Sequence, residues 1–394
     1  MSQRPVATLA ALFFGAIALR PQIVGIGPLL PAIQESLDVS HALVGLLATI
    51  PVLCMGLFAP PAAYLAARVG TRAGIAWALA LIGVFGIARA VSPGAALLIL
   101  LTWPVGIGMG LAGALAPVAV KERFSVRPAG PTGIYTTGVQ VGSAVSAAVA
   151  VPLAGWYGGW RWSLAVFSLV TCALAGVWLV LTRHESRHER SATPPPPLPW
   201  RSGAAWLLVA LFSLMASTYY GINAWLPDSY VERGWSTGRA GNLLAVLNLV
   251  AIPAALLIPW LSDHVGGRRP WLFATAISFL VGVTGFVLLP GAAYAWVVAV
   301  GLASGAMFAL VMTVPLDIEE EARHVGALVG MMLGLGYTIG ALSPIVLGAV
   351  RDLTGTFTGS LWLLVGFCLL MLGSVVALPR RSGSAVAADR GRRS

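Results

Sequence analysis

The sequence predicts an all-α membrane protein with twelve transmembrane helices in two pseudo-symmetric six-helix halves. Composition, apolar runs and an internal repeat support this prediction. Of the 394 residues, 58% are hydrophobic and 10% are charged, whereas a soluble domain carries about 25% charged residues. Apolar runs of about 20 residues, enough for a helix to cross a hydrocarbon core, follow one another along almost the whole chain. A β-barrel is disfavoured because its strands alternate in hydrophobicity over ~10 residues.

Breaks at charged residues, prolines and glycines define the spans. The first run is longer than the ~7–15 apolar residues of a signal peptide and leads into a second span, so we expect a retained helix. An even number of spans places both termini on one side of the membrane. The predicted spans are residues 6–34, 41–67, 73–92, 95–120, 131–157, 160–182, 203–227, 239–262, 270–289, 292–316, 325–350 and 357–379.

The positive charges orient these spans. Of the 24 Lys and Arg residues, eighteen fall on the side of the termini and five on the other side. The last one, Arg20, falls within a span. Basic residues favour the cytoplasmic side, so we expect both termini in the cytoplasm. This distribution also explains the net charge of +10 without a nucleic-acid partner. The five basic residues assigned to the outer side are Arg89, Arg161, Arg233, Arg239 and Arg351.

The longest polar connection separates the two halves. Residues 183–202 contain four consecutive prolines, which predict a semi-rigid linker. We therefore expect an N-terminal half at 1–182, a C-terminal half at 203–379 and a basic cytoplasmic tail at 380–394.

No residue pattern predicts a metal or cofactor. His184 and His188 are four residues apart in the linker but lack a third ligand nearby. Cys54, Cys172 and Cys368 lie far apart in apolar runs, where cysteine serves as a small packing residue. We therefore expect no metal and no cofactor.

An internal repeat relates the two halves. A shift of 196 residues aligns Gly25–Arg72 with Gly221–Arg268 without a gap, and thirteen of the 48 positions are identical. Biased composition would give about five identities by chance. The repeat therefore indicates two homologous halves.

The repeated loops resemble a known family. "YLAARVGTR" (64–72) and "WLSDHVGGRR" (260–269) are similar to the loop signature of the major facilitator superfamily. The resemblance implies that these loops latch one conformation, although Ala67 replaces the usual aspartate in the first loop. The implied latch residues are Arg68, Gly70, Arg72, Asp263, Gly266 and Arg268.

Longer stretches resemble the cyanate and nitroimidazole permease branch of that superfamily. They include "LRPQIVGIGPLLPAI", "GMGLAGALAPVAVKERF" and "YYGINAWLPDSYVERGWS". The resemblance implies a secondary active or facilitative transporter of a small polar or anionic, cyanate-like solute that works by alternating access. It also implies that the protein lies in the inner (plasma) membrane. The alternative is an efflux carrier for nitroimidazole-type or other small toxic compounds. A channel is a further rival, which counterflow of labelled substrate would distinguish.

An enzyme is disfavoured on the residues alone. An intramembrane enzyme needs a nucleophile with its base, or a metal cluster, at membrane depth. All five histidines lie at span ends or in loops.

Arg20 is the strongest candidate for substrate binding. It lies about 14 residues, or about 21 Å, along a helix that begins near Val6, close to the bilayer midplane. Pro21 removes a backbone donor and frees the carbonyl of Ile17, which predicts an interrupted helix. All fourteen acidic residues fall at span ends or in loops. Arg20 is therefore either a fixed charge that binds an anion, or a structural charge neutralised by carbonyls or a distant acid.

The corresponding helix of the second half supplies a candidate opposite wall. Tyr220 and Asn223 are three residues apart and Tyr219 and Asn223 four apart, so these side chains share a helix face. The alternative is interhelix hydrogen bonding. Gln22 is excluded from the site, because residues two apart on a helix point about 200° away from each other.

Three further polar residues lie in later spans. Gln140 and Tyr337 fall at mid-depth, and Tyr135 falls nearer the cytoplasmic end. Either substrate contact or structural hydrogen bonding would explain them.

Small residues at four-residue spacing predict close helix packing. Gly138 and Gly142 share one helix face, as in other membrane helices that approach closely. No Gly-Lys-Ser/Thr sequence follows such a pair, so an ATP-driven pump is excluded.

The sequence leaves the coupling mechanism open. No Asp, Glu or His is predicted at mid-depth, and Glu35, Asp228 and Asp317 lie at helix ends. Either protons use such end residues, or the carrier is a uniporter or an exchanger. We expect a monomer whose partners are the solute and the lipid bilayer.

Overall fold

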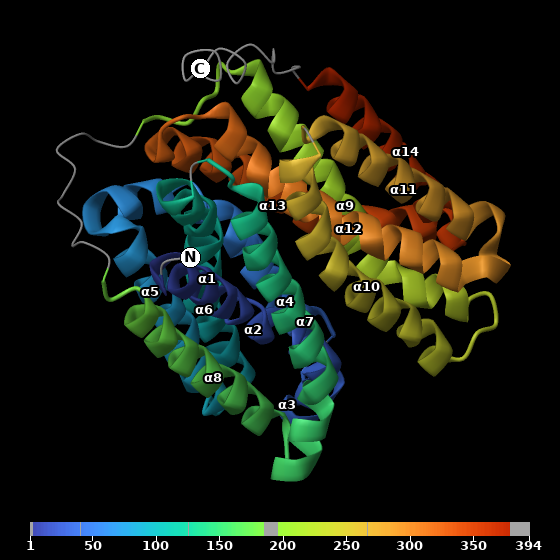
Figure 1. Ribbon diagram of the computed structural model, residues 1–394. Helices are drawn as coiled ribbons and strands as arrows, with labels where there is room; N and C mark the ends of the chain where they lie inside the picture. Colours follow the sequence, from blue (N-terminus) through green and yellow to red (C-terminus); the bar gives the residue numbers. More distant parts are fainter. Residues whose placement is uncertain (1–2, 40, 125, 185–195, 266, 379–394) are drawn as a thin grey trace.

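The computed structural model describes residues 3–39, 41–124, 126–184, 196–265 and 267–378. Throughout these residues the regular structure is helical, and they contain no β-strand (Figure 1). Within these ranges, eleven helices are long and apolar enough to cross a membrane, and Gly45–Leu57 is a shorter apolar helix. The prediction of an all-α membrane protein is confirmed.

The elements follow the predicted spans closely. The first half comprises α1 (Gln3–Ile17), α2 (Pro21–Val24), the 3-10 helix η1 (Gly27–Leu29), α3 (Leu30–Leu37), α4 (His41–Leu57), α5 (Ala62–Ala90), α6 (Ala95–Arg123), α7 (Ala129–Tyr157) and α8 (Trp160–Leu181). The second half comprises α9 (Gly203–Val231), α10 (Thr237–His264), α11 (Arg269–Leu288), the 3-10 helix η2 (Pro290–Ala292), α12 (Ala293–Ile318), α13 (Ala322–Thr354) and α14 (Phe357–Ala377).

The first span is interrupted, as the prolines predict. α1 ends at Ile17, and the Leu19 amide donates to the Ala16 carbonyl at 3.2 Å in a tight turn before α2 begins. Pro21 has no N–H, so the Ile17 carbonyl has no helical partner. This carbonyl lies directly against Gly142 of α7, where a side chain would collide with it. The break in α1 and the small residue of α7 therefore fit each other.

The second and third spans are joined by a kink. The sequence predicts a loop here, but α5 runs on through Gly70, whose φ of 80° and ψ of 160° interrupt the helical geometry. Glycine adopts positive φ without steric cost. The second span therefore consists of α4 and the first two turns of α5.

The two halves touch mainly at one end. α7 packs against α10, and α4 packs against α13. Gly133 of α7 approaches the carbonyl of Leu256, and Gly330 of α13 approaches Pro60. These contacts lie toward the end that bears Asp263, which we call the closed end. α7 and α10 diverge away from it, so the halves form a V (Figure 1).

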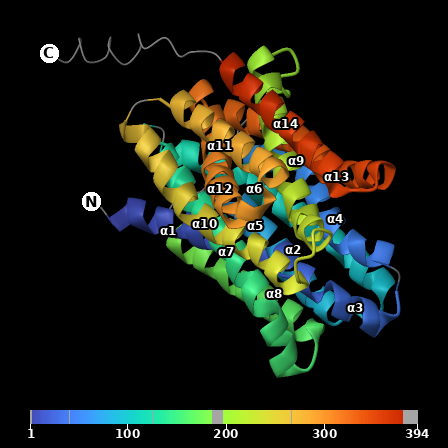
Figure 2. The same ribbon diagram turned by 90° about the vertical axis from the view of Figure 1, so that its right-hand side faces the viewer.

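The opposite end of the first half is tied by a hydrogen bond. The Trp160 indole N–H donates to Ser36 Oγ at 2.9 Å. This bond holds the start of α8 beside α3 (Figure 2). The first half is thus braced internally where the two halves separate.

Candidate functional site

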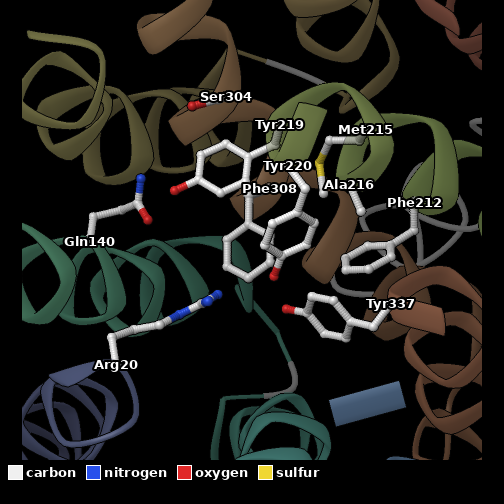
Figure 3. Close-up of a pocket in the computed structure, with 10 residues that line it drawn as sticks. All are labelled: Arg20, Gln140, Phe212, Met215, Ala216, Tyr219, Tyr220, Ser304, Phe308 and Tyr337. Carbon is white, nitrogen blue, oxygen red and sulfur yellow. The ribbon is translucent and has the colours of Figure 1, made fainter. Parts of the chain in front are cut away.

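A cavity lies between the halves, beside the break in the first span. Its volume is about 40 Å³, on a measure in which one water needs roughly 10–15 Å³. It has room for a few waters or a small solute. Ten residues line it: Arg20, Gln140, Phe212, Met215, Ala216, Tyr219, Tyr220, Ser304, Phe308 and Tyr337 (Figure 3).

Arg20 supplies the charge of this cavity. It is the N-cap residue of α2 and its side chain points toward the hydroxyls of Tyr220 and Tyr337, with which it interacts (Figure 3). None of the ion pairs among the described residues involves Arg20. Two phenols do not neutralise a guanidinium, so the cavity favours an anion as the missing partner.

Aromatic rings of the second half face this arginine. We call Phe212, Tyr219, Tyr220, Phe308 and Tyr337 the aromatic wall. Phe212 and Tyr337 meet edge to face with ring centroids 5.0 Å apart, and Tyr219 and Tyr220 do so at 5.5 Å. Such pairs hold each other in orientation. The wall therefore presents fixed rings and hydroxyls to the cavity.

One member of the wall is oriented from behind. The Tyr219 hydroxyl donates to Asn248 Oδ1 at 3.2 Å, and the Asn248 amide donates to the Leu244 carbonyl at 2.9 Å. Asn248 belongs to α10, so this chain of bonds links two helices of the second half.

Five residues selected from the sequence come together in this cavity. Arg20 and Gln140 approach from the first half, and Tyr219, Tyr220 and Tyr337 approach from the second. The structure thus gathers side chains that are up to about 300 positions apart in the sequence.

The other two selected residues are placed differently. Tyr135 lines an adjoining cavity that also reaches Arg20 and Tyr337. Asn223 lines neither cavity, and its amide donates to the Tyr219 carbonyl of its own helix at 2.8 Å. Helical spacing placed Asn223 near the tyrosines, but the amide turns back onto the backbone.

The remaining lining residues were not selected from the sequence. Phe212, Met215, Ala216 and Tyr219 recur at three- and four-residue intervals on α9, so the helical period could have extended the face outward from Tyr219. Phe308 and Ser304 of α12 carry no charge, proline or motif that would mark them.

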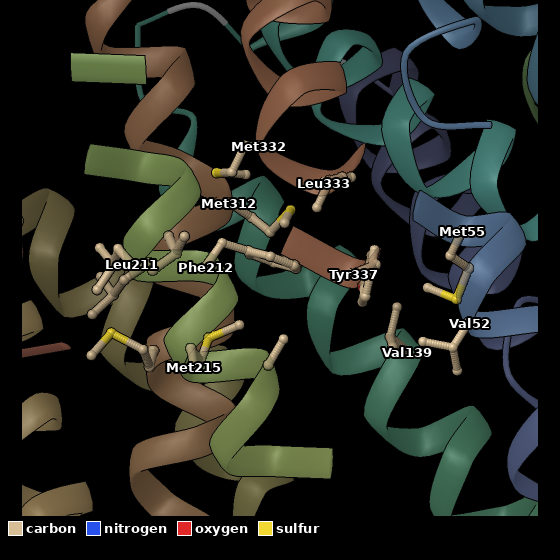
Figure 4. Close-up of a cluster of buried hydrophobic side chains, with 14 of the residues drawn as sticks. Val52, Met55, Val139, Leu211, Phe212, Met215, Met312, Met332, Leu333 and Tyr337 are labelled. Atoms are coloured by element: carbon tan, nitrogen blue, oxygen red, sulfur yellow. The ribbon is translucent and has the colours of Figure 1, made fainter. Parts of the chain in front are cut away.

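An apolar layer separates the cavity from the closed end. Met55, Met312 and Leu333 are almost fully buried and come from α4, α12 and α13. They belong to a cluster that spans both halves (Figure 4). Since each half contributes side chains, any movement of one half against the other changes this layer.

The second repeated loop (260–269) bridges the two halves. Asp263 pairs with Arg268 at 2.8 Å and also accepts a hydrogen bond from the Gly130 amide at the start of α7, at 2.9 Å. A carboxylate at a helix N-terminus is favoured by the helix dipole. Arg268 also pairs with Asp317 at 2.7 Å. Gly266, selected from the sequence, lies outside the described residues.

In the first repeated loop (64–72), the hydrogen bonds of Arg72 stay within the first half. Arg72 donates to Thr182 Oγ1 at 3.1 Å, and its carbonyl accepts from the Trp178 indole at 2.9 Å. Arg68 is exposed and Gly70 forms the kink. Asp263 is therefore bonded across the two halves, whereas Arg72 is bonded within one half.

Sequence reasoning missed one fully buried arginine, Arg89. The positive-inside count places Arg89 on the outer side of the membrane, but the structure buries it completely in the last turn of α5. It donates to Gln22 Oε1 at 3.4 Å. Gln22 points away from the cavity, as its angular offset from Arg20 predicts.

Metal ligands do not gather in the described part of the chain. No group of three or more His, Cys, Asp and Glu side chains there could hold a metal ion. His188 lies outside the described residues, and Cys54, Cys172 and Cys368 are free thiols.

Comparisons with known proteins agree with this architecture. A family model, the Major Facilitator Superfamily, matches residues 9–341. The solved structure of the human organic anion transporter MFSD10 superposes with a TM-score of 0.78 at 15% identity, over 95% of this chain and 100% of that chain. At this identity the likeness concerns the fold, and it confirms the predicted fold class.

Two characterised relatives are similar over nearly their full length. The chain is 30% identical over 365 residues to the cyanate transport protein CynX of Escherichia coli (strain K12), which covers 92% of this chain and 94% of that protein. It is 31% identical over 370 residues to the 2-nitroimidazole transporter of the same strain, with 93% of each chain covered.

Proposed function

The chain belongs to the Major Facilitator Superfamily, and from this premise we propose that it carries a small polar or anionic, cyanate-like solute by alternating access. Members of this family are transporters and not enzymes. The observation that carries the proposal is Arg20. It lies in a small cavity between the halves and has no carboxylate partner among the described residues. The relative that transports cyanate supports the same charge class.

Alternating access follows from the division of the site between the halves. Arg20 and Gln140 belong to the first half and the aromatic wall to the second. If the halves rock about the cavity, the solute stays between the same side chains while the closed end opens and the other end closes. The apolar layer under the cavity would part in that movement.

The topology is part of the proposal. Both termini lie in the cytoplasm of a plasma-membrane protein, with halves at 1–182 and 203–379 joined by the linker 183–202 and followed by the tail 380–394. The closed end then faces the cytoplasm, since the loops around Asp263 carry the arginines that favour that side. The state described here would receive solute from outside.

Coupling to protons has fewer candidate residues to support it. No Asp, Glu or His lines the cavity among the described residues. Asp317, one of the helix-end acids, is engaged by Arg268. Glu35 and Asp228 remain as proton-binding groups, and without them the carrier is a uniporter or exchanger. We expect it to work as a monomer.

The aromatic wall favours a second candidate, an efflux carrier for nitroimidazole-type or other small toxic compounds. Five rings surround the cavity, and flat heteroaromatic solutes stack on such rings. The relative that transports 2-nitroimidazole supports this candidate. The two candidates differ in whether charge or stacking selects the solute.

Transport into proteoliposomes tests the proposal. Purified protein is reconstituted, and uptake of labelled cyanate is measured with cyanate or 2-nitroimidazole inside the vesicles. We expect saturable uptake that internal cyanate accelerates, as a carrier requires and an open pore does not show. Acceleration by 2-nitroimidazole alone would transfer the proposal to the second candidate. Flux that does not saturate would contradict a carrier.

A further inference from the structure

The first half buries an arginine that the cavity does not use. Arg89 has no exposed surface and takes part in no ion pair among the described residues. Its Nη1 donates to Gln22 Oε1 at 3.4 Å, whereas Nε and Nη2 have no hydrogen-bond partner in the described part of the chain. The last turn of a helix favours a cation, but two unpaired buried donors are costly.

Gln22 is held on both sides. Its Nε2 donates to Ser168 Oγ at 2.7 Å and to the Leu164 carbonyl at 3.4 Å. A side chain at Gly86 would collide with Ser168 and crowd Gln22, so glycine leaves the space for this amide. Arg89 holds the oxygen of the Gln22 amide, and the two α8 residues hold its nitrogen. These bonds fix the orientation of the amide.

The anchored residue lies in the same short segment as Arg20. α2 has four residues, Arg20 is its N-cap, and breaks in the helix precede and follow it. A segment of this length has little rigidity of its own. Because Gln22 and Arg20 point in opposite directions, holding Gln22 in the first half fixes the direction in which Arg20 enters the cavity.

We propose that Arg89 is a positioning residue that acts through Gln22 to aim Arg20 at the substrate. The inference rests on the proposed function of Arg20. An apolar side chain in place of Arg89 would avoid the cost of burying a charge. The arginine is therefore explained by the orientation that it imposes rather than by the stability that it adds.

The test uses a variant that removes the anchor without leaving a lone buried charge. Gln22→Met/Arg89→Met replaces both partners by apolar side chains, a change that is nearly neutral or stabilising in other proteins. Arg239→Met is the control, since Arg239 stacks on Trp235 at 3.7 Å, away from the cavity. The full-length protein is studied in lipid nanodiscs.

Hydrogen–deuterium exchange gives a readout that needs no substrate. We expect amides 22–27 of the double variant to exchange about tenfold faster, which corresponds to about 1.4 kcal/mol of lost local stability. The melting temperature should equal or exceed that of the wild type, and exchange in α9 should not change. Unchanged exchange at 22–27 would overturn the proposal. A lowered melting temperature with faster exchange throughout the first half would also do so, because Arg89 would then be structural.

Binding of labelled cyanate links the anchor to Arg20. We expect the dissociation constant to rise about tenfold in the double variant, because a binding group that is slightly misplaced loses much of its effect. Arg89→Lys should keep most of the affinity. In an Arg20→Gln background the double variant should add nothing, and an additive loss would contradict action through Arg20. The proposed function would be refuted if Arg20→Gln left cyanate affinity unchanged, or if the wild type bound no cyanate. Faster exchange of amides 22–27 in the double variant would then still show that Arg89 and Gln22 hold this segment.

Discussion

The guanidinium of Arg20 lies where a charge is energetically costly, and it has no carboxylate partner among the described residues. An arginine near the centre of a transmembrane helix costs about 3 kcal/mol on insertion scales. Its interactions with Tyr220 and Tyr337 offset part of this cost. The planar guanidinium offers parallel donors to an anion, which the ammonium group of lysine cannot do. The residue therefore suits recognition of a small anion better than a purely structural role.

The hydroxyl of Tyr337 should contribute to binding. Tyr337→Phe keeps the ring against Phe212 but removes the polar group that faces Arg20. Loss of one such hydrogen bond costs about 0.5–1.5 kcal/mol, so the dissociation constant for cyanate should rise about 2- to 10-fold. Scintillation proximity binding measures it. Tyr64→Phe, on an exposed tyrosine of α5, is the control, and equal affinity in both variants would remove Tyr337 from the site.

At the residue scale, the sequence showed what local chemistry decides. Arg20 stood out because a charge in an apolar run is rare, and it lines the cavity, whereas Gln22 does not, as its angular offset predicts. Arg89 was not recognisable, because its surroundings come from distant parts of the chain. Its partner Gln22 lies 67 positions away, and Ser168, which holds Gln22, lies 146 positions from Gln22. The sequence of one chain does not show such contacts.

The break between α1 and α2 is the element on which the site depends. Pro21 prevents a continuous helix, and Gly142 gives the freed carbonyl of Ile17 a place against α7. The predicted interruption is confirmed because proline acts locally. The kink at Gly70 was expected as a loop, because sequence does not reveal that two spans share one helical path.

Restoring the helical hydrogen bond should stabilise the protein and impair binding. Pro21→Ala supplies the missing N–H. A proline in a helix interior costs about 3 kcal/mol, so the substitution should raise the apparent melting temperature. Arg20 would then rotate with a regular helix, so affinity for cyanate should fall about tenfold.

The matched control for this change is Pro152→Ala, in the interior of α7 and outside the cavity lining. It should also stabilise the protein while leaving affinity unchanged. Preserved cyanate affinity in Pro21→Ala would mean that the break does not position Arg20.

At the scale of the whole molecule, the two homologous halves are not equivalent. The repeat in the sequence predicts two similar bundles, and the structure contains them. Which end is closed could not be predicted, because a symmetric repeat fits either state. The replacement of aspartate by Ala67, opposite the retained Asp263, indicated only that the loops would differ. Asp263 bonds to α7 across the interface, whereas the hydrogen bonds of Arg72 stay within the first half.

Asp263 should hold the closed end together. Asp263→Asn weakens its pair with Arg268 and its bond to the Gly130 amide. Loss of a charge-assisted bond costs about 1.5–3 kcal/mol, so the population with the closed end open should rise at least about tenfold. Spin labels at positions 127 and 323 should report longer distances. Asp352→Asn, on an exposed ion pair, is the control, and identical distance distributions in both variants would contradict this assignment.

The central claim is that Arg20 binds a small anion, and equilibrium binding of labelled cyanate to purified protein in nanodiscs tests it most directly. Wild type, Arg20→Gln and the control Arg239→Gln are compared after their melting temperatures have been shown to be equal. We expect saturable binding by the wild type and the control, with affinity lowered at least about tenfold in Arg20→Gln, since a charge-assisted bond is worth about 1.5–3 kcal/mol. Equal affinity in all three proteins would contradict the claim and make Arg20 a structural charge.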